Sequence, residues 1–79
     1  MVKTFTVKPT MVEQIEFIGA WLDECVTALY NTGWKIISIK PTNIPLYDYD
    51  LHKRVYGPMY IIVAEGGDCD AFEKEMAAD

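Results

Sequence analysis

An apolar stripe with helical spacing constrains the fold of this chain more than any other sequence feature. Its members recur at intervals of four and three residues: Met11, Ile15, Ile18, Leu22, Cys25 and Leu29. That spacing puts them on one face of an α-helix, which must be buried against another element. Thr10 and Glu13 form a T-x-x-E capping box before the stripe, and Gly33 suits the left-handed residue that ends a helix. The sequence therefore predicts a helix of about 20 residues, or ~30 Å.

Three further segments have strand patterns. Residues 3–8 alternate threonine with apolar residues, which predicts a half-buried strand that ends at the following proline. Residues 34–40 (WKIISIK) are apolar enough to predict a central strand, ended by Pro41. Residues 59–64 (MYIIVA) are apolar on both faces and rich in β-branched side chains, so they predict a second buried strand.

The connection 41–58 is too long for a structureless loop in a compact domain. Its alternation over residues 46–51 predicts either a short extra edge strand or an extended arm. Residues 65–67 (EGG) predict a turn. Asp68 or Asp70 can then cap a short C-terminal helix.

The predicted elements follow in the order β-α-β-(β)-β-α. A chain of 79 residues has room for one core, so residues 1–79 are expected to form a single domain. The fold class that follows is α+β, a two-layer sandwich. A mixed or antiparallel sheet of three or four strands would carry the long helix on one face, with the short C-terminal helix beside it.

The charge and cysteine content exclude several classes of function. The net charge of −5 argues against direct nucleic-acid binding, because phosphate contacts need clustered Lys and Arg, and Lys53-Arg54 is the only adjacent basic pair. No apolar run approaches the roughly 18–20 residues of a membrane span, and the N-terminus lacks a secretory signal. Cys25 and Cys69 form no CxxC motif and are expected to be reduced and mostly buried. The chain is therefore expected to be cytoplasmic, without membrane contact.

Residues 27–39 (TALYNTGWKIISI) resemble small bacterial and phage domains of unknown function. Those domains share a strand, a helix that ends in Gly-Trp, and a strand-strand return. The resemblance extends over residues 3–64, and its specific part is Gly33-Trp34 with the flanking apolar pattern. It implies the fold rather than an activity, because those domains have no agreed catalytic residues. The segment 41–58 departs from their usual shorter hairpin.

The motif Asp48-x-Asp50-x-His52 is the sharpest candidate for chemistry. On a strand, alternation would put the three side chains on one face. Two carboxylates and an imidazole suit Mn²⁺, Fe²⁺ or Zn²⁺, which would make the chain a small metal-dependent enzyme. The other interpretation is a solvated edge with a lone histidine, because nothing else in the sequence supplies supporting partners. We favour the latter and expect no catalytic residue, metal or cofactor.

The predicted helix carries acids without cations, since no Lys or Arg lies between Lys8 and Lys35. On a helical wheel Trp21 falls at the edge of the apolar stripe and Phe17 lies outside it, beside acidic residues. Exposed aromatic residues surrounded by charge are typical of interface hot spots. The alternative is that residues 41–58 fold back and cover this pair. The candidate partner-binding residues are Glu16, Phe17, Trp21, Asp23, Glu24, Asp48 and Asp50.

These features favour a non-catalytic protein-binding module. The expected partner has a basic surface, as nucleic-acid-binding proteins do. Small phage-encoded inhibitors, including anti-CRISPR proteins, resemble this chain in size and charge, which implies an acidic inhibitor that blocks such a surface. One alternative is a self-associating structural or accessory domain, a homodimer formed through a sheet edge or through Phe17 and Trp21. The other alternative is the metal-dependent enzyme described above.

Overall fold

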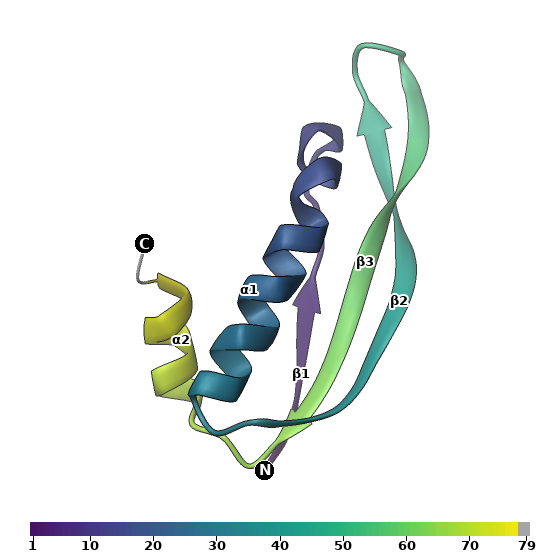
Figure 1. Cartoon of the computed structure of the whole chain (residues 1–79). Helices are drawn as coiled ribbons and strands as arrows, with labels where there is room; N and C mark the ends of the chain where they lie inside the picture. The colour runs from purple at the N-terminus through teal and green to yellow at the C-terminus, as the bar shows by residue number, and fades with distance from the viewer. Residues whose placement is uncertain (78–79) are drawn as a thin grey trace.

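The computed structural model describes residues 1–77 and contains three strands beneath a helical layer (Figure 1). The strands are β1 (Val2–Val7), β2 (Lys35–Asp48) and β3 (Lys53–Glu65). The helices are the 3-10 helix η1 (Val12–Phe17) and the α-helices α1 (Ile18–Asn31) and α2 (Cys69–Ala77). The sheet is antiparallel, in the order β1-β3-β2. The predicted α+β fold is therefore confirmed.

The central strand is β3, and β2 lies at an edge. The prediction that residues 34–40 form a central strand ended by Pro41 is wrong on both counts. β2 continues through Pro41 and Pro45, which pair in register with Tyr60 and Tyr56 of β3. Proline has no N–H to donate, but an edge strand tolerates it where the nitrogen faces away from the neighbouring strand. A β2 at the edge can therefore include both prolines.

β2 and β3 extend beyond β1 as a twisted two-stranded ribbon (Figure 1). Residues 41–58, expected to be a long connection or an edge-strand arm, form the outer part of this hairpin. Leu46 of the ribbon is buried, and it packs with Ile15 of η1 around Gly57. A Cβ atom on Gly57 would lie 2.9 Å from Cδ1 of Leu46 and 3.2 Å from Cγ1 of Ile15. The ribbon is thus anchored to η1.

A β-bulge interrupts the predicted alternation of β2. The register shifts between Ile36 and Ser38, so Ile37 has no partner in β3. Ile39 then lies opposite the fully buried Ile62, yet Ile37 and Ile39 remain 52% and 42% exposed. The bulge therefore leaves apolar surface at the β2 edge.

The predicted long helix begins differently from the expected capping box. The backbone N–H and the hydroxyl of Thr10 both donate to Oε1 of Gln14, at 2.7 and 3.0 Å, so the capping partner is Gln14 and not Glu13. The first six residues are a 3-10 helix, which often precedes an α-helix, and α1 itself has 14 residues.

The helix end follows the sequence prediction. Gly33 has a φ of 83°, and the N–H of Trp34 donates to the carbonyl of Leu29 at 2.9 Å. The N–H of Gly33 donates to the carbonyl of Tyr30 at 3.3 Å. These two bonds make a Schellman motif, which satisfies the last carbonyls of α1.

The core lies between α1 and the sheet. Ile18 and Leu29 of α1 and Ile62 of β3 are fully buried, and Phe5 and Val7 of β1 lie beside them. Burying a Leu or Ile side chain contributes roughly 1.5–3 kcal/mol. These contacts hold α1 across β1 and β3.

Trp34 connects the sheet to α2. Its indole is 3% exposed, lies edge-on to Phe5 with ring centroids 5.1 Å apart, and donates through Nε1 to the carbonyl of Asp68 at 3.4 Å. A Cβ atom on Gly67 would overlap this indole. Asp68 caps α2, as predicted, because its Oδ1 accepts the N–H of Ala71 at 3.1 Å. The Trp34 contact thus fixes where α2 begins.

The Gly67 contact yields a stability prediction. Gly67→Ala forces a methyl group into the Trp34 indole and is expected to lower the free energy of unfolding by about 2–3 kcal/mol. Gly19→Ala is the matched control, because no atom lies within 4 Å of its Cβ position and alanine favours a helix, so it should raise stability by about 0.5–1 kcal/mol. Urea denaturation measures both, and equal effects of the two substitutions would contradict the account.

Candidate docking groove

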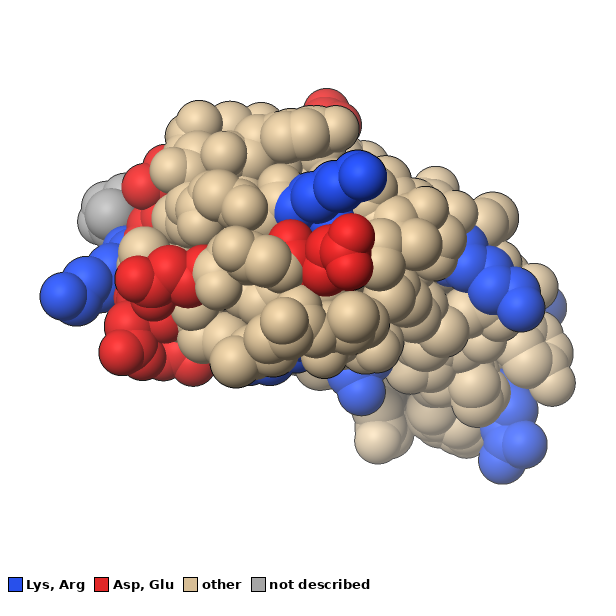
Figure 2. Space-filling model, turned by 90° about the horizontal axis from the view of Figure 1, so that it is seen from below, with Lys and Arg blue, Asp and Glu red and all other residues tan. Residues whose placement is uncertain are grey.

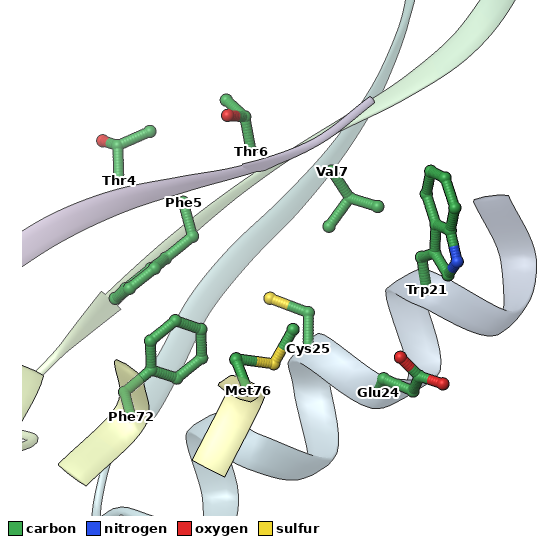
Figure 3. Close-up of a pocket in the computed structure, with 9 residues that line it drawn as sticks. All are labelled: Thr4, Phe5, Thr6, Val7, Trp21, Glu24, Cys25, Phe72 and Met76. Carbon is green, nitrogen blue, oxygen red and sulfur yellow. The ribbon is translucent and has the colours of Figure 1, made fainter. Parts of the chain in front are cut away.

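An apolar groove runs along the free edge of β1, between that strand and the two α-helices. Its volume is about 610 Å³. The groove is lined by Thr4, Phe5, Thr6, Val7, Trp21, Glu24, Cys25, Phe72 and Met76 (Figure 3). Three elements that are far apart in the sequence therefore build one site.

The strand alternation of β1 sets the chemistry of the groove wall. Phe5 and Val7 point toward the helices, whereas Thr4 and Thr6 point away from them (Figure 3). Phe5 meets the ring of Phe72 from α2 at a centroid distance of 4.8 Å. The groove wall is therefore apolar where β1 faces the helical layer.

Trp21 and Phe17 form the aromatic end of the site. Their rings are stacked, with centroids 6.4 Å apart and an interplanar angle of 23°. Trp21 is partly buried and lines the groove, while Phe17 stays 50% exposed. Glu24, one turn beyond Trp21, lines the same groove. The structure thus brings together three of the residues singled out from the sequence.

The hairpin does not cover this aromatic pair. Its buried Leu46 packs on Ile15 instead, and Phe17 keeps half of its surface. The alternative in which residues 41–58 fold over Phe17 and Trp21 is therefore wrong. The reason is that β2 and β3 stay paired to the end of the ribbon, which carries them along η1.

The remaining sequence candidates lie outside the groove. Glu16 borders a separate hollow of about 460 Å³ on η1, and Asp23 is exposed on α1. Asp48 and Asp50 lie at the tip of the hairpin, at the opposite end of the molecule from α2 (Figure 1). None of these four residues lines the groove, and Asp48 and Asp50 lie far from it.

Asp48, Asp50 and His52 do not share one strand face, which the metal-dependent alternative required. Asp48 ends β2, and the next four residues form the hairpin turn. Oδ1 of Asp48 accepts the N–H groups of Asp50 and Leu51, at 3.0 and 3.1 Å, and His52 has a left-handed φ of 53°. Within residues 1–77 no three His, Cys, Asp or Glu side chains gather closely enough to hold a metal ion.

Neither cysteine forms a disulfide, and the two differ in exposure. Cys25 is buried at the base of the groove, and this burial raises the pKa of its thiol. Cys69, at the start of α2, is only partly buried, and the Nζ atom of Lys3 lies 3.7 Å from its sulfur. The expectation that both would be mostly buried holds for Cys25 alone.

Charge is distributed unevenly over the molecular surface. Figure 2 shows acidic side chains gathered toward the α2 side, while Lys and Arg side chains lie mainly over the rest of that face. Residues 9–34, which include α1, carry no Lys or Arg, and α2 carries Asp70, Glu73 and Glu75 against Lys74. The helical layer that borders the groove is therefore the acidic part of the molecule.

Sequence reasoning missed the part of the groove that β1 and α2 contribute. The strand and helix spacing of Phe5, Val7, Phe72 and Met76 indicates burial and gives no sign of a groove. The signal that makes them a site is the strand order, which leaves β1 at an edge. That order depends on long-range pairing and cannot be inferred from local spacing.

Comparisons of the chain with protein-family models, with curated proteins and with solved structures found no match. The resemblance at Gly33-Trp34 is thus a local one that identifies no family. No helix within residues 1–77 has both the length and the apolar composition of a membrane span. The groove's own chemistry is what indicates a function.

The cysteine environments predict different reactivities toward iodoacetamide at pH 8. Cys25 should react at least about tenfold more slowly than Cys69, because burial limits access and its raised pKa lowers the thiolate fraction. Mass spectrometry of the labelled native chain measures the two rates. In the unfolded chain, which is the control, the two thiols should react at similar rates. Equal rates for Cys25 and Cys69 in the native chain would contradict the burial of Cys25.

Proposed function

We propose that this chain is a non-catalytic protein-binding module that docks on a basic protein surface through the groove face. The observation that supports the proposal most directly is the combination of an apolar groove with an exposed aromatic stack and an acidic wall residue. Trp21 supplies the partly buried anchor, Phe17 extends it to solvent, and Glu24 supplies the charge. Trp is among the residues most enriched at the energetic centre of protein interfaces, and charges around such a centre add selectivity.

The acidic helical layer defines the partner's character. Like charges repel, so a partner surface rich in Lys and Arg is favoured and an acidic one is rejected. Proteins that bind nucleic acids carry such surfaces. A small acidic chain seated there keeps the nucleic acid from its site, so the proposal includes an inhibitory role like that of small phage-encoded inhibitors. The expected location is the cytoplasm, where those partners lie.

The proposal predicts a salt-sensitive association that depends on Glu24. Glu24→Lys should lower the association rate about tenfold at low ionic strength, because it reverses a charge on the docking wall. Glu65→Lys is the matched control, since it changes the net charge equally but lies on β3, paired with Lys35 and Val2. Raising the salt to about 0.5 M should remove most of the difference between the two variants.

The measurement uses proteins captured from source cells by the immobilised chain and identified by cross-linking. Surface plasmon resonance of each purified partner then compares wild type, Glu24→Lys and Glu65→Lys. The proposal predicts that nucleic acid competes for the same partner and that only Glu24→Lys slows association. Equal slowing by both variants would show that association depends only on net charge. No slowing by either variant would show that the groove is not part of the interface.

A further inference from the structure

β1 is an edge strand whose outer side is chemically open. It pairs with β3 along all of Val2–Val7, and within residues 1–77 no second strand pairs with it. In an antiparallel ladder, alternate residues of an edge strand direct their N–H and C=O groups away from the sheet. None of the six residues is proline, so none of these donors is lost.

The outer part of the other sheet edge carries two prolines, whereas β1 carries none. Pro41 and Pro45 of β2 both pair in register with β3, so each nitrogen faces outward and offers no N–H there. They are four residues apart, so both remove donors from the same outer side. Prolines at an edge are a known protection against unwanted strand pairing. The chain thus protects the outer part of the β2 edge and leaves the β1 edge without prolines.

The helical layer extends beyond β1 on its open side. The backbone of α2 packs against α1 and, among the described elements, against no strand. Figure 1 shows α2 on the far side of α1 from β3 and β2, and Figure 3 shows α1 and α2 on the same side of β1. Within residues 1–77, the helical layer therefore covers the space beside the free edge of β1, and no strand fills that space.

The groove occupies that space, and its walls define what fits. Its volume of about 610 Å³ falls in the roughly 300–1,000 Å³ range of ligand pockets. Trp21, Phe72 and Met76 can receive apolar side chains that project from an added strand toward the helices. Glu24 is the charged residue in the lining, so a cationic side chain next to the apolar ones is complementary.

A second copy of this chain fits the site poorly. An antiparallel pair of two β1 strands would put the α1 of the second copy on the same face of the joined sheet. That α1 contacts its own β1 and is about 10 Å wide, whereas neighbouring strands are only about 4.8 Å apart. It would then occupy the place that α2 of the first copy already holds. A single extended segment without its own helix avoids this overlap.

We infer that β1 receives an extended segment of a partner protein as a fourth strand, which lies under α2. The segment alternates apolar side chains, which enter the groove, with polar ones that point away, and it carries a Lys or Arg opposite Glu24. Main-chain hydrogen bonds to β1 give the affinity, and the groove gives the specificity, as in other cases of strand addition. The inference rests on the proposed function, because it specifies how that partner is held.

The test uses a panel of synthetic eight-residue peptides, blocked at both ends. Leu, Ile, Val or Phe alternates with Thr, and one position is Arg. Titration into the ¹⁵N-labelled chain, followed by NMR, should shift the amides of residues 2–7 and the indole of Trp21. Methylation of every second peptide nitrogen, in the register that faces β1, should abolish binding, while methylation in the other register should leave it intact, because only the former donates to the strand.

Two substitutions refine the test. Trp21→Ala should weaken the best peptide at least about tenfold, as loss of an aromatic anchor does. Glu24→Lys should weaken the Arg peptide and strengthen its Arg-to-Glu counterpart, a reciprocal exchange that general misfolding cannot produce. Tyr56→Ala on the exposed face of the hairpin is the control and should leave both affinities unchanged.

The outcomes separate this inference from the proposed function. Strand addition would be overturned if the peptides shifted only hairpin amides. It would also be overturned if no peptide bound while partner capture still depended on Glu24. Either result would leave the proposed docking function intact. Peptide binding at β1 without any Glu24-dependent partner would support the strand site and overturn the basic-surface partner. A concentration-dependent dimer with protected β1 amides would make a second copy the occupant and overturn the inference.

Discussion

The packing of the Trp34 indole above Gly67 is the contact on which the arrangement of this fold depends. It follows directly from the end of α1, where Gly33 turns the chain into β2. The indole then meets Phe5 of β1 edge-on and donates to the carbonyl of Asp68. One side chain therefore joins the sheet, the end of α1 and the start of α2. Since α2 lies over the open side of β1, this contact helps to place one wall of the groove.

Charge and edge chemistry act together at the groove. The helical layer is acidic because residues 9–34 hold no cation, while the basic residues lie mainly on the strands. The open edge of β1 offers backbone groups that any extended chain can pair with, so it gives affinity without selecting a sequence. The groove walls select the sequence of the bound segment. Trp21 favours a bulky apolar side chain, and Glu24 favours a cationic one. A docking function needs both contributions, and this face supplies both.

The sequence predicted the elements whose signals are local. The apolar stripe from Ile15 to Leu29 predicted the helix and its inward face, whereas Met11 precedes the helix and is exposed. Gly33 marked the end of α1, and Asp68 marked the cap of α2. The β2–β3 pairing was harder to predict, because proline normally ends a strand and only an edge position tolerates Pro41 and Pro45. The alternation over residues 46–51 predicted either an edge strand or an extended arm, and that spacing contains no signal for the turn that the Asp48 carboxylate closes.

The candidate site was only half predictable for a similar reason. Phe17, Trp21 and Glu24 stand out because a helical wheel shows which residues leave the buried stripe. Phe5 and Phe72 look like ordinary core residues in the sequence. They become walls of a groove because the long-range order β1-β3-β2 leaves β1 at an edge beneath the end of α2. That order is a property of the assembled sheet and of no single segment.

The most direct test of the central claim is an isotope-filtered NMR measurement on the labelled chain with an unlabelled bound peptide. Strand addition predicts close backbone contacts between the peptide and β1. They are facing α-protons in an antiparallel ladder, or amide-to-α-proton contacts in a parallel one. It also predicts slowed hydrogen exchange for alternate amides of residues 2–7. A bound peptide that contacts Trp21 and Phe72 but shows no backbone contact with β1 and no slowed exchange would contradict the account.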